Sequence, residues 1–360
     1  MKQFKRSTYI FMLLCMICTK VFAYDFSAKN ADGVTIYYNY INNGTELEVY
    51  HNGNYGNYSG VVVIPEEVTF MGNTRKVTAI HYETFFKCYS LTSVKIPNCV
   101  KSIGNSAFCW CYNLTSVNIP NGVSSIGLDT FYKCSKLTSV DIPNSVTSFG
   151  NHAFSGCSSL TSVNIPSGVK RIPYEAFMDC ASLTSITIPN TVTSIDYYAF
   201  KNCSSLISVT IPNSVTEIKF KAFDGCNFST VISENYNPSD ISPDAFSNNT
   251  FYNATLYVPY GTIDKYKAAS GWNKFSLIVE NGNENSIINA SKNALSIKSE
   301  SGRLIIEGVD DGLTVKVFTL DGILIGSAIS RNGVALVNTN IPHSTAIVKF
   351  GNRSLKIMMK

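Results

Sequence analysis

The sequence predicts a β-rich solenoid of 23-residue repeats, and three periodic features support this fold class. Cysteine recurs every 23 residues, and phenylalanine recurs with the same step three positions earlier. An Ile-Pro pair keeps this spacing from Ile96-Pro97 to Ile211-Pro212. The two columns are Cys88, Cys111, Cys134, Cys157, Cys180, Cys203 and Cys226, and Phe85, Phe108, Phe131, Phe154, Phe177, Phe200 and Phe223. Such a period is typical of a solenoid, in which each unit buries its apolar residues against its neighbours.

One repeat unit has the pattern L-T-S-V-x-I-P-N-x-V-x-x-I-x-x-x-A-F-x-x-C-x-x. The L-T-S-V-x-I stretch predicts a strand whose leucine, valine and isoleucine point inward. Proline ends this strand because it has no N–H to give to the ladder. The V-x-x-I stretch predicts a second short extended piece, and A-F-x-x-C predicts an arc that returns the chain to the sheet. No run with helical period is long enough for a typical α-helix.

The unit resembles the BspA-like leucine-rich repeat, whose leucine, Ile-Pro, valine, isoleucine, Ala-Phe and cysteine positions recur here in the same order. The resemblance covers six full units from Leu91 to Phe228, with a degenerate unit on each side. It implies a right-handed coil with a short parallel sheet. It also implies a secreted or surface-exposed protein associated with adhesion and protein binding.

Residues 1–23 have the pattern of a secretory signal peptide. A basic start is followed by an apolar core from Tyr9 to Cys18 and by a small-x-small cleavage site directly before Tyr24. The alternative is a lipoprotein anchor at Cys15 or Cys18, although neither has a small residue directly before it. The apolar run is too short for a transmembrane helix, and no other run qualifies.

Residues 24–60 predict an N-terminal β cap. Val34 to Ile41 and Thr45 to Tyr50 alternate as strands do, and an Asn-Asn-Gly turn signal lies between them, so we expect a β-hairpin. A solenoid needs such a cover because its first coil otherwise exposes an apolar face and a strand edge. The start of this segment also resembles the N-terminal cap of the same family.

The solenoid is predicted over residues 61–250, and its first unit is irregular. Val61 to Pro65 take the place of the strand, and an insert around Met71 lengthens the following turn. The last unit keeps the step at Ala245-Phe246, but Asn249 replaces the cysteine.

Residues 251–280 predict the C-terminal cap of the solenoid. A strand is expected up to Pro259, followed by a short helix from Thr262 to Ser270. We expect Trp272 and Phe275 to seal the last coil.

Residues 281–293 are rich in asparagine and serine and predict a linker. Residues 294–360 alternate in short runs, with a hairpin signal at Asp321-Gly322, and predict a small antiparallel β-sandwich. This domain is similar to the C-terminal sorting domain of type IX secretion substrates, through Val317 to Gly322 and Ala346 to Phe350. It departs from that pattern where Ser-Thr-Ala replaces the usual Gly-x-Tyr. A plain accessory β-domain is the alternative.

Composition indicates an extracellular protein and argues against a nucleic-acid binder. The formal net charge is +4, but residues 1–23 carry four basic residues and no acid, so the mature chain has 25 of each sign. No basic stripe supports DNA or RNA binding. The polar, weakly charged remainder suits a secreted protein or one attached to the bacterial outer surface.

Nine cysteines remain after residues 1–23, and the seven in the column are expected to be buried, reduced thiols. Disulfides are the alternative, because neighbouring coils bring equivalent Cα atoms near bridging distance. Cys99 and Cys109 lie outside the column and are either partners or free. No cysteine spacing matches a zinc site, so no metal and no cofactor is expected.

Two polar columns on the expected strand face are the candidate binding residues. They are Ser93, Ser116, Ser139, Ser162, Ser185 and Ser208, and Lys95, Asn118, Asp141, Asn164, Thr187 and Thr210. Such hydroxyl and amide arrays can hydrogen-bond a peptide or a glycan; the alternative is an ordinary solvated strand face. A further column, with Tyr82, Leu128, Tyr174, Tyr197 and Phe220, predicts either an interaction patch or stacked rings that bridge coils.

The sequence holds no catalytic constellation, so we expect a binding protein and not an enzyme. Asp141 stands alone in its column, and the four histidines fall in different columns. The expected partner is a protein, such as a host matrix protein. The alternative is a glycan-binding accessory module of a surface polysaccharide system. An enzyme on a β-solenoid, the third hypothesis, would require carboxylates from different coils to converge.

Overall fold

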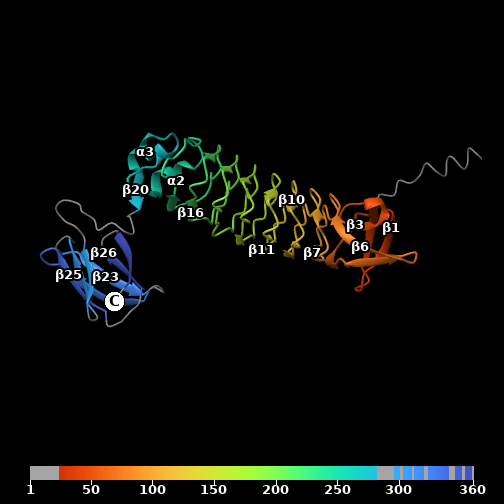
Figure 1. Ribbon diagram of the computed structural model, residues 1–360, viewed down its shortest axis with the longest axis horizontal. Coiled ribbons are helices and arrows are strands. Elements are labelled where there is room, and N and C mark those ends of the chain that lie inside the picture. The colour runs from red at the N-terminus through yellow and green to blue at the C-terminus, as the bar shows by residue number, and fades with distance from the viewer. Residues whose placement is uncertain are drawn as a thin grey trace, which may run out of the picture. The chain divides into compact units, whose positions relative to one another are not determined.

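The computed structural model describes residues 24–281, 296–300, 303–309, 312–319, 323–339, 345–350 and 353–358. The chain forms two compact units, Met1–Asn281 and Gly282–Lys360. The first unit is a stack of coils with a β cap at one end and short helices at the other, which confirms the predicted β-rich solenoid (Figure 1). The predicted signal peptide (1–23), the linker beyond Asn281 and the Asp321-Gly322 turn lie outside the described residues.

The L-T-S-V-x-I stretches form what we call the strand face. Its strands are β4 (Gly60–Val63), β7 (Leu91–Lys95), β9 (Ser116–Val117), β11 (Ser139–Val140), β13 (Ser162–Val163), β16 (Ser208–Ile211), β18 (Thr230–Ser233), β19 (Thr255–Pro259) and β20 (Leu277–Asn281). All pair in parallel, and equivalent repeat positions face each other, as Val94 faces Val117. The leucine, valine and isoleucine of each stretch are mostly buried.

Strands on this face are shorter than the sequence predicts. The strands of the central coils span only Ser-Val, and single bridges join Asn118 to Asp141 and Asn164 to Thr187. The expectation of a full six-residue strand is therefore wrong for these coils. The ladder stops one residue after valine. There follow an isoleucine, whose N–H bonds to an asparagine side chain at Ile96 and Ile142, as described below, and a proline without an N–H.

The V-x-x-I stretches form a second extended face, as expected. After β6 (Asn73–Ile80) its strands are β8 (Ser102–Ile103), β10 (Ser125–Ile126), β12 (Ser148–Phe149), β14 (Arg171–Ile172), β15 (Ser194–Ile195) and β17 (Glu217–Ile218). They also pair in parallel, with Ile126 opposite Phe149.

The A-F-x-x-C arcs form the third face, and their phenyl rings stack into one buried column. From Phe85 to Phe246 successive centroids lie 5.0–5.4 Å apart, with interplanar angles of 2–12°. Stacked aromatic pairs contribute about 0.5–1.5 kcal/mol beyond the burial of their area. This column is therefore a continuous packing element that links every coil to the next.

The cysteine column lies beside the rings, and its thiols are hydrogen-bond donors. From Cys111 to Cys226 each Sγ donates to the phenylalanine carbonyl 26 residues earlier, at 3.0–3.2 Å. All nine described cysteines are free. Burial raises the pKa of Cys88 to about 11 and that of Cys157 to about 12, so these sulfurs keep their protons at neutral pH. Each thiol gives a second hydrogen bond to a buried carbonyl that already accepts the backbone N–H of the cysteine in its own arc.

The N-terminal cap is a three-stranded antiparallel sheet that extends the solenoid. Strands β2 (Thr35–Ile41) and β3 (Glu46–Tyr50) form the predicted hairpin through η1 (Asn42–Gly44), and β1 (Phe26–Lys29) pairs with β2. Strand β3 then pairs in parallel with β6 of the first coil. The cap therefore covers the first coil by continuing its sheet.

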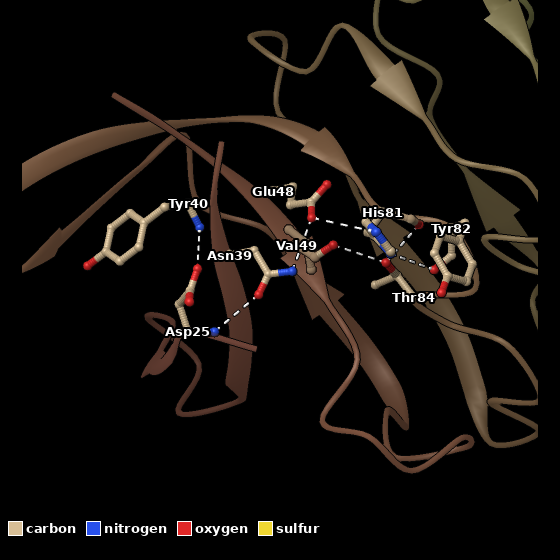
Figure 2. A network of polar contacts seen from close by, with 8 residues as sticks. All are labelled: Asp25, Asn39, Tyr40, Glu48, Val49, His81, Tyr82 and Thr84. Carbon is tan, nitrogen blue, oxygen red and sulfur yellow. Dashed lines mark hydrogen bonds and ion pairs between the residues drawn. The ribbon is translucent and has the colours of Figure 1, made fainter. Parts of the chain in front are cut away.

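A polar network fixes the cap to the first coil (Figure 2). The Asp25 N–H donates to Asn39 Oδ1 at 3.1 Å, and Asn39 Nδ2 donates to Glu48 Oε1 at 3.1 Å. Glu48 Oε1 in turn lies 3.7 Å from His81 Nε2. Thr84 Oγ1 donates to the Val49 carbonyl at 3.0 Å. These contacts join β2 and β3 of the cap to the first coil.

The insert around Met71 is a β-hairpin, where the sequence suggested only a longer turn. Strand β5 (Glu67–Phe70) pairs antiparallel with β6 across the two residues Met71 and Gly72. Both have positive φ, 50° and 78°, as a tight two-residue hairpin turn requires. The signal was weak because methionine is an unusual residue at such a position.

Helix α2 (Asn248–Asn253), α3 (Ile263–Ala268) and η2 (Trp272–Lys274) close the other end. Trp272 and Phe275 are buried, and their rings lie 6.2 and 5.4 Å from Phe246, the last ring of the column. The cap therefore covers the apolar end of the stack, as expected.

The second unit contains two antiparallel sheets. One has the order β21 (Ser296–Glu300), β22 (Arg303–Glu307), β25 (Val334–Asn338), and the other β24 (Leu324–Ile329), β23 (Thr314–Thr319), β26 (Thr345–Phe350), β27 (Arg353–Met358). A separate core forms from residues of both sheets, including Leu304, Val317 and Val337.

Candidate functional site

The twelve predicted binding residues lie along the strand face, and ten of them are exposed. Ser93 and Thr210 are half-buried. Neighbouring members approach each other, since Ser93 Oγ lies 3.3 Å from Ser116 Oγ. A shallow hollow of about 530 Å³ brings together five of them, Ser139, Asp141, Ser162, Asn164 and Thr187.

Two members of this face have a structural role. Asn118 Oδ1 accepts the Ile96 N–H at 2.9 Å, and its Nδ2 donates to the Ile96 carbonyl at 2.8 Å. Asn164 makes the same pair of bonds to Ile142, at 3.2 and 2.8 Å. Each amide replaces a missing backbone pair between coils, so both ends of these side chains are already used within the protein.

Replacing Asn164 by alanine is expected to lower the free energy of unfolding by about 1–3 kcal/mol, because both Ile142 backbone groups lose their partner. The matched control is Thr187→Ala, an exposed residue of the same column, with an expected change within about 0.5 kcal/mol. Urea unfolding followed by tryptophan fluorescence measures both. Equal stability of the Asn164 variant and the native chain would show that the amide does not hold the coils together.

The backbone of the arc face has positive φ angles at the same positions in successive coils, so equivalent side chains line up from coil to coil. Two positions in each arc have positive φ. The first column, at 53–60°, is Glu83, Ser106, Asp129, His152, Glu175, Tyr198 and Lys221; the second, at 57–76°, is Lys87, Trp110, Lys133, Gly156, Asp179, Asn202 and Gly225. Coil-to-coil hydrogen bonds of 2.7–3.3 Å stabilise this conformation, such as those from the Phe85 N–H to the Ala107 carbonyl and from the Trp110 N–H to the Tyr132 carbonyl.

A continuous row of half-buried rings crosses the arc face, and we call it the aromatic row. Its members are Trp110, Tyr132, His152, Tyr174, Tyr198 and Phe220. Successive ring centroids lie 5.2–6.2 Å apart. Lysine ammonium groups lie over three of them, at 5.7 Å from Tyr132, 5.1 Å from Tyr198 and 5.4 Å from Phe220. The row spans consecutive coils on a rigid backbone.

At the Trp110 end of this row lies a hollow of about 370 Å³, here called the arc hollow. Its lining residues are Glu83, Phe86, Ser106, Cys109, Trp110, Asp129, Tyr132, His152 and Glu175. His152 is held between two of the carboxylates. Its Nδ1 lies 2.9 Å from Asp129 Oδ1, and its Nε2 lies 3.6 Å from Glu175 Oε2.

This geometry suits ligand binding better than nucleophilic catalysis. Both nitrogens of His152 face carboxylates, so neither faces Ser106 or Cys109 as a base. Burial, with the nearby charges of Asp129 and Glu83, raises the pKa of Cys109 to about 12, so its thiol stays protonated. The described residues hold no group of three or more His, Cys, Asp or Glu suited to a metal ion.

The acidic residues and histidine of the arc hollow were missed from the sequence. Glu83, Asp129, His152 and Glu175 belong to one column at the repeat step, and Ser106 completes it. The four histidines lie in different columns, and the column of His152 contains several residue types, so no pattern of one residue type predicts the cluster. The 23-residue repeat would have predicted this column if it had been followed at the position two residues before each phenylalanine. Carboxylates from different coils therefore do converge, here around a histidine.

None of the helices within the described part of the chain combines the length and the apolar character needed to cross a membrane. A comparison with curated proteins finds no match. Among solved structures, the chain is similar to a leucine-rich repeat protein of T. pallidum, with 28% identity over 53% of this chain and 86% of the other, at a TM-score of 0.47. A leucine-rich repeat protein from Bacteroides ovatus is 25% identical over 72% of this chain and 77% of its own, at a TM-score of 0.40.

A family model of the BspA-type leucine-rich repeat region matches residues 78–206 and 170–268, with six copies. The matched residues make up more than half of the chain and include the arcs that carry the aromatic row. The chain belongs to the BspA-type leucine-rich repeat family.

Proposed function

We propose that this chain is a secreted or surface-attached protein that binds a protein partner through its arc face. The observation that carries the proposal is the aromatic row. Protein interfaces are enriched in tyrosine, tryptophan and arginine, and their strongest contacts come from such anchors. Six half-buried rings on a stiff backbone present these anchors with little conformational entropy to lose on binding.

Adhesion, with a host matrix protein as the partner, is the finer part of the proposal. Its support is the signal-peptide pattern of residues 1–23, the absence of net charge in the mature chain and the low charged fraction of 15%. The similarity of residues 294–360 to type IX sorting domains supports export by that route. The absence of an activated nucleophile in the arc hollow supports binding without catalysis.

A glycan is the second candidate ligand, and one observation favours it. The strand-face hollow of about 530 Å³ combines the hydroxyls of Ser139, Ser162 and Thr187 with the carboxylate of Asp141. Such donors and acceptors match the hydroxyl groups of a sugar. This candidate uses a different face, so one experiment separates the two.

The test measures binding of the full chain to a panel of purified extracellular matrix proteins and to a glycan array. An arc-face variant carries Trp110→Ala, Tyr174→Ala and Tyr198→Ala; a strand-face variant carries Ser139→Ala, Ser162→Ala and Thr187→Ala. We expect a matrix protein to bind, and the arc-face variant to lose at least about tenfold in affinity, as loss of interface anchors does. The strand-face variant should bind as the native chain does.

Circular dichroism and thermal unfolding of both variants control for loss of fold. The opposite result, with the strand-face variant losing affinity and the arc-face variant keeping it, would contradict the proposal. Binding to glycans alone would favour the second candidate.

A further inference from the structure

The arc hollow contains negative charge that no lysine or arginine of the described chain neutralises at close range. Its carboxylates are Glu83, Asp129 and Glu175. None of them has a lysine or arginine nitrogen within 4 Å among the described residues. Glu83 Oε2 accepts the Tyr55 hydroxyl at 2.6 Å, and the other two face His152.

Three aromatic residues form another part of the wall. Phe86, Trp110 and Tyr132 line the hollow from consecutive coils. Ring faces attract cations, with tryptophan the strongest, and the attraction grows when the cation is removed from water. Carboxylates beside rings therefore favour a positively charged group over a neutral one.

Two lysines lie over rings of this wall and do not fill the hollow. Lys87 Nζ lies 5.1 Å from the Phe86 centroid, and Lys133 Nζ lies 5.7 Å from that of Tyr132. They rest on rings and make no ion pair with the hollow's carboxylates, and neither lines the hollow. Three carboxylates line the hollow, and neither lysine ammonium group is among its lining residues.

We propose that the arc hollow binds the guanidinium group of an arginine side chain on the partner. Arginine fits better than lysine, because its planar group stacks on rings and pairs with a carboxylate through two parallel hydrogen bonds. The inference rests on the proposed function, since it names the chemistry by which the arc face recognises its protein partner. The arginine stacks against Trp110 and directs its N–H groups to Glu83 or Glu175.

The test uses the two indole N–H signals of the ¹⁵N-labelled full chain. The sequence contains two tryptophans, and Trp272 is buried with its Nε1 donating to the Ser239 carbonyl, so Trp110→Phe assigns the signals. The probes are N-acetyl-arginine amide, its uncharged citrulline counterpart and a methyl glycoside. We expect the arginine probe to shift the Trp110 signal at about millimolar concentration and the other two not to shift it.

Glu83→Gln and Glu175→Gln should each weaken the arginine probe about threefold or more. Raising NaCl from about 0.05 to about 0.5 M should also weaken it, because salt screens partly exposed charges. Two carboxylates are tested because Glu175→Gln also changes the surroundings of His152. Glu217→Gln, an exposed acid paired with Lys219 on another face, is the matched control and should have no effect.

Equal shifts with arginine and citrulline, a shift with the glycoside, or no shift with any probe would each overturn the inference. These results are independent of the panel experiment. If the arc-face variant loses its protein partner while the arginine probe has no effect, the proposed function stands and the inference falls. If the probe shifts Trp110 while the arc-face variant keeps its partner, the hollow takes arginine but the proposed function falls.

Discussion

Replacing Phe154 by alanine is expected to lower the free energy of unfolding of the solenoid by about 3–5 kcal/mol. The ring is fully buried, lies 5.3 Å from Phe131 and 5.4 Å from Phe177, and meets the edge of Phe149 at 6.0 Å. Alanine removes the packing with both neighbouring coils and leaves a cavity in a stack that cannot close without shifting its backbone. A repeat array transmits stability only through such contacts between neighbours.

Urea unfolding followed by tryptophan fluorescence measures this change, because both tryptophans belong to the solenoid unit. The matched control is Phe220→Ala, the same change at a half-buried ring on the arc face, with an expected loss of about 1 kcal/mol. Similar losses in the two variants would show that the ring column does not link the coils.

The inward columns were predictable because repetition gives equivalent residues equivalent surroundings. Phe154 and Cys157 recur with the same neighbours at every step, and an apolar residue in such a column can only face the core or a large exposed seam. The structure places the phenyl rings and the sulfurs inside. The repeat pattern did not predict that the thiols are hydrogen-bond donors. Cys157 Sγ, for example, donates to the carbonyl of Phe131 in the preceding coil.

The lengths of the strands could not be predicted from the sequence. Alternation of apolar and polar residues indicates which side chains are buried, but not which backbone groups pair between coils. Ile142 is buried as an inward strand residue should be, yet its N–H bonds to the Asn164 side chain. Asn164, a predicted binding residue, is therefore also part of the ladder. A side chain that takes the place of a backbone pairing partner cannot be recognised from the sequence alone, because its partner lies in the neighbouring coil.

The arc hollow was hidden for a different reason. Sequence patterns of function depend on residue type, and the column through Glu83, Asp129 and His152 changes type at each step. Its positive φ angles also place polar, β-carbon-bearing residues where glycine is usually expected. This strained backbone conformation is stabilised by hydrogen bonds to the neighbouring arcs. Those bonds form only when the coils are stacked, so the sequence of one repeat does not predict them.

Replacing Trp272 by alanine is expected to have an effect of similar size, about 3–5 kcal/mol, confined to the C-terminal end. The indole is buried against Phe246, 6.2 Å away, and against Tyr266, 5.5 Å away, and its Nε1 donates to the Ser239 carbonyl at 3.1 Å. Without it the end of the ring column loses its cover and a carbonyl loses its donor. Terminal coils of a solenoid depend on such caps because they have a neighbour on one side only.

Native-state hydrogen exchange locates the loss. The amide of Phe223, which donates to the Ala245 carbonyl in the last arc, should exchange at least about a hundredfold faster, whereas the amide of Phe85, bonded to Ala107 at the other end, should change little. The matched control is Trp110→Ala, which removes the half-buried indole and should leave Phe223 protected. Uniform loss of protection along the array would mean that the coils unfold as one unit and that the cap stabilises all of them equally. Unchanged protection of the Phe223 amide would mean that the Trp272 indole does not stabilise the last coils.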